Sequence, residues 1–299
     1  MEHVHCSLCG ADEPQPWLTL SDRFSGQTFS LSRCDRCGLI YSADRPSMDE
    51  LPDYYPQDYE AYQQPETEMS SSQVWHSNRM WEMQVDYIEK FKPSRGQLLD
   101  VGCATGEFLN IARKRGWQVH GLELIEQTAQ IARQRHGIQV DTGRLETVNL
   151  PENTFDLITM WDVLEHLPDP LASLQHCCRL LRESGVIVFS IPNLASVDRY
   201  LFGRSWIGWD APRHFTLFTL ETLQAAFKKT GYKMVDRRCF LGGKGTFLLS
   251  LDIVLASRPG AKFVKAMYPV ISGLLWPYRQ VSYLLYRGPI LAVAACKQG

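Results

Sequence analysis

Residues 98–106, which read LLDVGCATG, decide the fold class of this chain. The apolar run over residues 97–101 predicts a buried strand, and the small residues after it predict a tight turn. Residues 107–115 then have the spacing of an amphipathic helix that stops at Gly116. In a doubly wound α/β sheet the ligand-binding crevice lies at the carboxyl ends of the strands, where this turn is expected. Small residues there let the backbone approach a ligand closely.

The same alternation of strands and helices extends through the middle of the chain. We expect helices over residues 73–91, 107–115, 125–136, 170–182 and 219–230. We expect strands over residues 97–101, 117–122, 138–140, 155–160, 186–191, 232–240 and 290–297. Strands that alternate with helices favour a mostly parallel sheet covered on both faces. The sequence therefore predicts an α/β fold with a doubly wound, mostly parallel, seven-stranded sheet.

The composition of the 299 residues excludes several classes of protein. With 44% hydrophobic and 21% charged residues, the chain can bury a core and is neither disordered nor a coiled coil. A net charge of −2 gives no general attraction to nucleic acid, so no DNA partner is expected. The first residues, MEHVHCSLCG, lack the apolar core of a signal peptide, and no segment offers the ~20 apolar residues that cross a bilayer. We expect a cytoplasmic protein whose paired cysteines hold metal.

The turn after residue 101 does not fit the dinucleotide-binding fingerprint. Aligned on Gly102, that fingerprint requires glycine at two positions where the chain has Ala104 and Glu107. Asp100, at the end of the strand, is poorly placed beside a pyrophosphate and suits an ammonium group. Glu123 ends the next predicted strand, where a carboxylate can accept both hydroxyl protons of a ribose. The ligand is therefore expected to carry a ribose and a cation but no phosphate, a description that S-adenosylmethionine meets. The alternative is an ordinary strand, turn and helix with two surface acids.

Residues 73–245 resemble class I S-adenosylmethionine-dependent methyltransferases. The resemblance lies in LLDVGCATGEFL (98–109), GLEL (121–124), VDTGRLETVNLPENTFDLITMWDVLEHLPDP (140–170) and GVIVFSIPN (185–193). It implies a Rossmann-like fold with S-adenosylmethionine as cofactor. The implied cofactor contacts are Asp100, Gly102, Ala104 and Gly106 at the methionine end, Glu123 at the ribose, Arg144 and Leu145 near adenine, and Trp161 and Asp162 toward the substrate opening. Ala104 is a departure from the family, which often has glycine there. We expect His166 to order its turn rather than to take part in catalysis.

Two C-x-x-C-G sequences precede this region. Their cysteines are Cys6, Cys9, Cys34 and Cys37, with 24 residues between the pairs. Zinc takes four thiolates in a tetrahedron, and each C-x-x-C turn supplies two of them. Four thiolates leave no open position, so this zinc is expected to be structural. A redox-active C-x-x-C is the alternative, but its βαβ context is missing. His3 and His5 are near enough in sequence to replace a cysteine ligand.

The chain therefore divides into three parts. A small zinc-ribbon-like domain covers residues 1–42, an acidic linker rich in tyrosine and proline covers 43–72, and the methyltransferase domain covers 73–299. This order is similar to that of bacterial sugar methyltransferases, including nucleotide-sugar C-methyltransferases and enzymes of surface-polysaccharide clusters. The resemblance implies a sugar-like acceptor, either a small molecule or a nucleotide-linked or lipid-linked glycan. Those C-methyltransferases carry a longer C-terminal domain than this chain does. We favour oxygen as the methylated atom, with carbon next.

Residues 205–216, SWIGWDAPRHFT, form the candidate catalytic loop. His214 is the candidate base, because the pKa of histidine lies near neutral pH. Asp210 is expected to orient His214 or to hold a sugar hydroxyl, and Arg213 to pair with an acceptor phosphate. The two tryptophans, Trp206 and Trp209, are expected to stack on a sugar. The alternative is that Arg213 and His214 cap the following helix and that the tryptophans are hydrophobic cover.

Residues 246–287 interrupt the expected hairpin between the last two strands. This insertion is apolar and contains five basic residues but only one acidic residue, Asp252. Its longest uncharged run, residues 266–278, is too short to span a bilayer. Three uses remain open: peripheral contact with the inner face of a membrane or a lipid-linked acceptor, a homodimer surface, or packing over the active site.

Two other functions remain open from the sequence. The first is an RNA or protein methyltransferase whose zinc domain docks the macromolecule. Such a domain needs a basic face, whereas residues 1–72 carry more acids than bases. The second is a cofactor-binding protein without catalytic activity.

Overall fold

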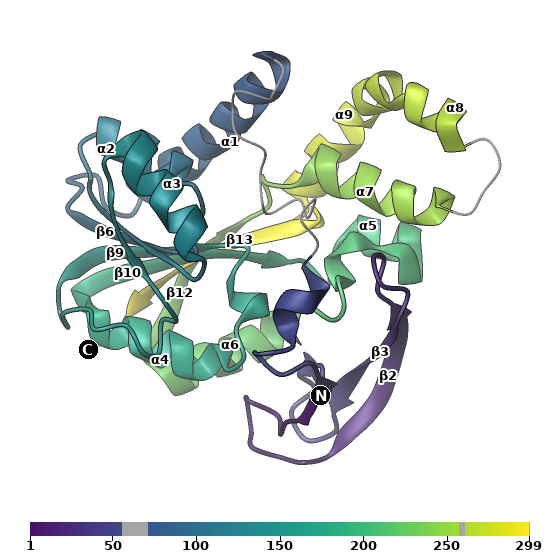
Figure 1. The fold of residues 1–299 in the computed structure, drawn as a ribbon, viewed down its shortest axis with the longest axis horizontal. Coiled ribbons are helices and arrows are strands. Elements are labelled where there is room, and N and C mark those ends of the chain that lie inside the picture. The colour runs from purple at the N-terminus through teal and green to yellow at the C-terminus, as the bar shows by residue number, and fades with distance from the viewer. Residues whose placement is uncertain (56–70, 257–260, 299) are drawn as a thin grey trace.

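The computed structural model describes residues 1–55, 71–256 and 261–298, and its centre is one seven-stranded sheet (Figure 1). In spatial order the strands are β12 (Tyr232–Arg238), β13 (Ile290–Lys297), β10 (Leu181–Pro192), β9 (Phe155–Trp161), β6 (Gln97–Val101), β7 (Gln118–Glu123) and β8 (Gln139–Thr142). From β10 to β8 all pairings are parallel, and β13 is antiparallel to both of its neighbours. The predicted fold class is confirmed.

Helices cover both faces of this sheet because the strand residues alternate between two cores. Leu98 packs with the face covered by α1 (Ser71–Glu89), α2 (Glu107–Lys114) and α3 (Glu126–His136). Leu99 packs with the face covered by α4 (Pro170–Leu180) and α6 (Leu220–Thr230). The helix bounds differ from the predictions by two residues or fewer at each end. The larger difference is at β10, which begins at Leu181 and contains an irregularity before Val186.

The N-terminal cysteine region shares its sheet with the rest of the chain. Strands β2 (Pro14–Ser21), β3 (Thr28–Cys34) and β4 (Ile40–Tyr41) continue into β11 (Thr216–Leu217), which directly follows the candidate catalytic loop. A second pair joins β1 (Glu2–His3) to β5 (Asp44–Arg45). The predicted boundary at residue 42 therefore does not separate two sheets.

The predicted linker contains more structure than its sequence suggested. Besides β5 it holds a short 3-10 helix, Leu51–Tyr54, and α1 begins at Ser71. Residues 56–70, the middle of that linker, lie outside the described residues.

The insertion between β12 and β13 is helical and projects from the body of the molecule (Figure 1). It consists of α7 (Gly243–Leu255), α8 (Ala261–Ala266) and α9 (Tyr268–Leu284), near α5 (Val197–Phe202). Among the residues that the structure describes, no helix combines the length and the apolar character that crossing a membrane requires. Several large apolar side chains of α8 and α9 are nevertheless exposed, including Phe263, Leu274, Trp276 and Leu284.

Candidate active site

The turn after β6 adopts a backbone that requires glycine at two positions. Gly102 and Gly106 have φ angles of 75° and 86°, in the left-handed region. A Cβ atom on Gly102 would lie 2.6 Å from Cγ2 of Val163. The backbone N–H groups of Gly102 and Cys103 both donate to the carbonyl of Leu122, at 2.7 and 3.1 Å, which ties the turn to β7. These hydrogen bonds fix the turn at the carboxyl ends of β6 and β7.

Ala104 also lies in the left-handed region, with a φ of 47°. This conformation is uncommon for a residue with a Cβ atom. Alanine in place of the family's glycine therefore raises the conformational free energy of the backbone, besides needing slightly more room for its methyl group. The N–H of Ala104 donates to Oε2 of Glu123 at 3.0 Å, and the N–H of Ile125 donates to Oε1 at 3.1 Å. Glu123 therefore fixes the turn relative to the start of α3.

Two buried carboxylates face this turn without a cationic partner. Asp100 accepts a hydrogen bond from Thr159 Oγ1 at 2.7 Å, and no salt bridge within the described ranges reaches Asp100 or Glu123. Burial raises the pKa of Asp100 to about 7; the charge of Glu123 adds to this rise and the Thr159 hydrogen bond opposes it. Burial also raises the pKa of Glu123, against the backbone N–H groups that it accepts. A cationic ligand with a ribose would offset both penalties. The two carboxylates therefore fit the positive charge and the ribose of S-adenosylmethionine.

The remaining predicted cofactor residues surround the same edge of the sheet. Gly143 donates its N–H to the carbonyl of Glu123 at 3.0 Å, which brings the segment after β8 beside the turn. In that segment Arg144 is exposed, whereas Leu145 is buried in the core. Trp161 stacks edge-on against Phe108, and its buried Nε1 donates no hydrogen bond within the described residues.

Asp162 follows β9 in a left-handed conformation, with a φ of 55°. Its N–H donates to Ser190 Oγ at 2.8 Å, and its Oδ1 accepts from the same hydroxyl at 2.6 Å. Burial raises the pKa of Asp162, although this hydrogen bond lowers it. The structure therefore fixes Asp162 between the ends of β9 and β10. The cofactor roles of all these residues stay predictions.

Arg213 is fully buried, and its hydrogen bonds join its own loop to two segments near the N-terminus. Its guanidinium donates to Asp22 at 2.7 Å, to both oxygens of Asp210 at 2.8 and 3.0 Å, and to the carbonyl of Tyr54 at 2.8 Å. All three nitrogens are engaged inside the protein. The expectation that Arg213 pairs with an acceptor phosphate is therefore wrong for this conformation.

Asp210 and the loop tryptophans also face inward. Burial would raise the pKa of Asp210, but the Arg213 guanidinium holds that pKa well below its usual range. Trp206 and Trp209 are buried against each other, with ring centroids 4.9 Å apart. The tryptophans are hydrophobic cover in this conformation, which corrects the expectation that they stack on a sugar.

His214 has the arrangement of a proton acceptor. Its Nδ1 lies 3.0 Å from the carbonyl of Gly208, so Nδ1 carries the hydrogen and Nε2 keeps a lone pair. Burial lowers the pKa of His214, although the charge of Asp210 opposes this, so the ring is neutral at neutral pH. The sequence prediction of a base at this position is compatible with this geometry.

A second histidine, His166, which the sequence predicted only to order its turn, and a glutamate, Glu165, adjoin His214. The rings of His166 and His214 lie 4.6 Å apart and nearly perpendicular. Burial lowers the pKa of His166 to about 3, and burial, with the charge of Asp162, raises that of Glu165 well above its usual value. Glu165 and His166 form the short 3-10 helix after β9 with Leu164. Their position just past a strand that ends at the ligand crevice was the available signal.

A cavity of about 450 Å³ lies between the N-terminal sheet, α5, α6 and the end of β10. Three arginines from three different segments line it: Arg33, Arg199 and Arg237. None of them forms a salt bridge with a carboxylate of the described residues, and Glu221 is the one acid in the lining. Arg199 and Arg237 lie over the rings of Tyr200 and Tyr286, at 4.3 and 5.1 Å. This cavity is suited to an anionic ligand.

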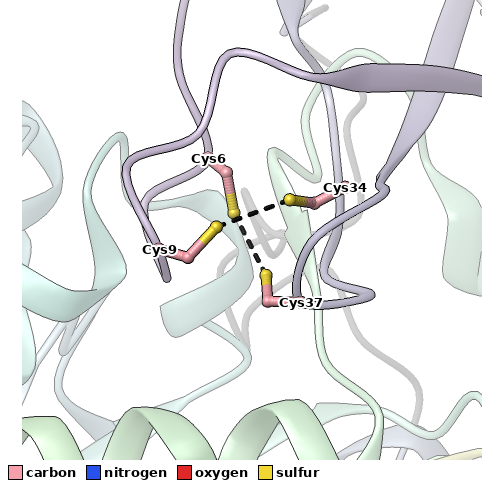
Figure 2. A group of neighbouring side chains, drawn as sticks. All are labelled: Cys6, Cys9, Cys34 and Cys37. Carbon is pink, nitrogen blue, oxygen red and sulfur yellow. Dashed lines mark hydrogen bonds between the residues drawn. The ribbon is translucent and has the colours of Figure 1, made fainter.

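The four N-terminal cysteines converge as the sequence predicts (Figure 2). Cys6 Sγ lies 3.4 Å from Cys37 Sγ, Cys9 Sγ lies 3.5 Å from Cys34 Sγ, and all four sulfurs lie within 4.8 Å of one another. A tetrahedral zinc with Zn–S bonds of about 2.3 Å places sulfurs about 3.8 Å apart, so the four thiols fit this metal. Both ring nitrogens of His3 are engaged by Asp12 and Asp44, which favours the cysteines as ligands.

Comparison with known proteins identifies the family. The family described as "Methyltransferase domain" matches residues 75–237. The ubiquinone biosynthesis O-methyltransferase of Idiomarina loihiensis is 35% identical over 113 residues, which cover 36% of this chain and 46% of that protein. The malonyl-[acyl-carrier protein] O-methyltransferase of Serratia marcescens is 36% identical over 137 residues, covering 44% and 53%. The chain spans about half the length of these curated relatives.

Solved structures share the fold at low sequence identity. The [4+2]-cyclase SpnF aligns with a TM-score of 0.52 at 15% identity, covering 85% of this chain and 98% of that one. Phosphoethanolamine N-methyltransferase 2 of Haemonchus contortus, in complex with S-adenosyl-L-methionine, aligns with a TM-score of 0.50 at 18% identity, covering 73% and 53%. The family match covers more than half of the chain and coincides with the sheet and the glycine turn described above. The chain therefore belongs to the methyltransferase-domain family and has the Rossmann-like fold of S-adenosylmethionine-dependent methyltransferases.

Proposed function

We propose that this protein transfers a methyl group from S-adenosylmethionine to a hydroxyl oxygen of a small, sugar-like acceptor. The observation that carries the proposal is the pair of buried carboxylates, Asp100 and Glu123, beside the glycine turn and without a cationic partner in the described residues. The family match supports methyl transfer, and two relatives named O-methyltransferases support oxygen as the methylated atom. The sugar-like acceptor comes from the resemblance in domain order.

The chain supplies a proton acceptor for this reaction. Bound S-adenosylmethionine supplies a methyl group on a positively charged sulfur. His214 takes the hydroxyl proton on Nε2 as the O–H bond breaks and the O–CH3 bond forms, and the S–CH3 bond electrons stay on sulfur. The carbonyl of Gly208 keeps the ring in position, and the buried charge of Asp210 stabilises the imidazolium. Arg213 acts only through Asp210, so it is a positioning residue.

The arginine-lined cavity supports an acceptor that carries an anionic group. Arg33, Arg199 and Arg237 lie at the carboxyl edge of the sheet, beside the end of β10. Guanidinium groups bind phosphate oxygens in pairs, and the tyrosine rings below two of them limit their motion. A nucleotide-linked or lipid-linked sugar has the required phosphate.

A structural zinc on the four cysteines has a clear use in this arrangement. It would hold β3 and the turns around it, and β3 pairs with β4, which pairs with β11. Because β11 begins at Thr216, two residues after His214, the zinc would fix the end of the candidate catalytic loop. The zinc would therefore stabilise the site without taking part in the reaction.

Release of S-adenosylhomocysteine tests the proposed function. The zinc-replete full-length protein would be assayed with nucleotide-linked sugars, lipid-linked sugars, free sugars and a phenolic acceptor. We expect turnover with a phosphate-bearing sugar, and an Arg199→Gln, Arg237→Gln double variant that raises KM more than it lowers kcat. Arg204→Gln, which changes a nearby arginine outside the cavity, is the matched control. Turnover restricted to the phenolic acceptor would refute the proposal that the acceptor is sugar-like. The absence of turnover with every acceptor would refute the proposed methyltransferase activity.

A further inference from the structure

Three potential metal ligands meet beside the end of β9. Glu165 and His166 come from the 3-10 helix after β9, and His214 comes from the loop before β11. One ligand atom from each lies within 4.8 Å of the other two. The N–H of Phe215 donates to the carbonyl of Glu165 at 2.8 Å, so the two segments are fixed to each other by the backbone. The cluster is separate from the four cysteines.

Both histidines have Nδ1 beside a backbone carbonyl. The Nδ1 atom of His214 lies 3.0 Å from the carbonyl of Gly208, and that of His166 lies 3.1 Å from the carbonyl of Arg213. A carbonyl can only accept, so each Nδ1 carries the hydrogen and each Nε2 keeps its lone pair. The hydroxyl oxygen of Tyr55, 3.2 Å from Nδ1 of His166, then accepts from the same N–H. No hydrogen bond among the described residues engages either Nε2. Backbone carbonyls orient metal-binding histidines in this way in many proteins.

The carboxylate of Glu165 lacks a partner for one of its oxygens. Its side chain is 1% exposed, and Oε2 accepts no hydrogen bond from the described residues. An unpaired buried carboxylate oxygen is unfavourable, because burial removes its hydration and no hydrogen bond from the described residues replaces it. A cation held by the two Nε2 atoms and Oε2 would satisfy all three groups.

We propose that Glu165, His166 and His214 bind a divalent first-row metal ion. Two imidazoles and one carboxylate are a donor set suited to Mn2+, Fe2+ or Zn2+, and three protein ligands leave coordination positions open for another molecule. In a use that rests on the proposed function, the open positions take acceptor oxygens, and the ion increases the acidity of a bound hydroxyl. His214 is then a metal ligand in place of the general base described above, and the hydroxyl proton passes to solvent as the O–CH3 bond forms and the S–CH3 bond breaks.

Titration with Mn2+ followed by electron paramagnetic resonance tests this site. The zinc-replete full-length protein is used, because Mn2+ prefers oxygen and nitrogen ligands and does not compete well for thiolates. We expect the signal of free Mn2+ to be lost with one ion bound per chain, and Glu165→Gln and His214→Gln to weaken binding at least about tenfold. His176→Gln changes a histidine on α4 outside the cluster and is expected to bind as the wild type does.

A thermal-shift experiment keeps the test independent of folding defects. Glu165→Gln has nearly the shape of the buried carboxyl group and carries no charge, so we expect it to fold and to be about as stable as the metal-free wild type. Mn2+ is expected to raise the melting temperature of the wild type only. No saturable Mn2+ binding by the wild type, or equal binding by both cluster variants, overturns the metal site. Metal-independent turnover that His214→Gln abolishes overturns the catalytic use of the metal and leaves methyl transfer intact. Metal binding without turnover refutes only the proposed reaction.

Discussion

Asp100 makes cofactor binding depend on pH. Its pKa of about 7 is raised mainly by burial, so its carboxyl is mostly protonated at pH 6 and mostly ionised at pH 8. Only the ionised form attracts a positively charged ligand. We therefore expect the affinity for S-adenosylmethionine to increase about tenfold from pH 6 to pH 8, as measured by calorimetry. Asp100→Asn should bind weakly and with a flat profile, while Glu126→Gln, at an exposed acid of α3, should keep the wild-type slope. A flat profile in the wild type would contradict this role.

Arg213 contributes to stability through the two carboxylates that it pairs. Arg213→Met leaves Asp22 and Asp210 buried without their shared cation. Breaking a buried ion pair from one side costs about 3–5 kcal/mol, which we expect as the loss in the free energy of unfolding. Chemical denaturation measures it. Arg36→Gln removes an exposed pair with Glu13 and should change stability by less than about 1 kcal/mol. Equal effects of the two variants would show that the buried network has no such role.

The glycine turn between β6 and α2 is the element on which cofactor binding most depends. Gly102→Ala puts a Cβ atom 2.6 Å from Val163 on a left-handed backbone, at a cost of about 1–3 kcal/mol. We expect the turn to shift and calorimetric affinity for S-adenosylmethionine to fall at least about tenfold. Gly273→Ala, on α9 with no atom within 4 Å of its added Cβ, is the matched control. Unchanged affinity in Gly102→Ala would exclude the turn from the binding site.

The regular elements were predictable because their signals are local. The apolar run 97–101, the turn glycines and helix ends such as Gly137 and Gly231 specify strand, turn and helix within a few residues. The start of β10 was not predictable, because Leu181 joins the sheet only through its pairing with β9 at Phe155. Local sequence does not specify such a pairing.

The candidate site was predictable only in part, for the same reason. Asp100 and Glu123 follow from strand ends, whereas one carboxylate partner of Arg213 is Asp22, 191 residues earlier in the chain. The segments of His214 and His166 are joined by the backbone hydrogen bond from Phe215 to Glu165, a contact that has no sequence spacing of its own. Long-range contacts thus decided which side chains of the predicted catalytic loop are buried.

At the scale of the whole molecule, the helical insertion has a surface on which several large apolar side chains are exposed. Phe263, Leu274, Trp276 and Leu284 of α8 and α9 are 58–78% exposed. The basic residues of the insertion outnumber its single acid, Asp252, which pairs with Lys265. Apolar side chains with tryptophan and basic residues are typical of helices that lie on anionic membranes. We propose an anionic lipid surface as the partner of these side chains.

Vesicle co-sedimentation checks this partner. We expect the full chain to bind anionic vesicles. A Leu274→Ser, Trp276→Ser, Leu284→Ser variant should lose most of that binding, because it removes apolar area that the membrane would otherwise bury. Ile131→Ser, at an exposed apolar residue of α3, should bind as the wild type does. Equal sedimentation of wild type and triple variant would contradict a membrane role. A dimer that light scattering detects in the wild type, and that the triple variant loses, would assign these side chains to contact with a second copy of the chain.

Calorimetry with S-adenosylmethionine on the intact, zinc-replete protein at pH 8 tests the central claim most directly. We predict one site per chain, with at least about tenfold weaker binding in Glu123→Gln. The absence of any saturable heat from the wild type, with either the cofactor or S-adenosylhomocysteine, would contradict the account.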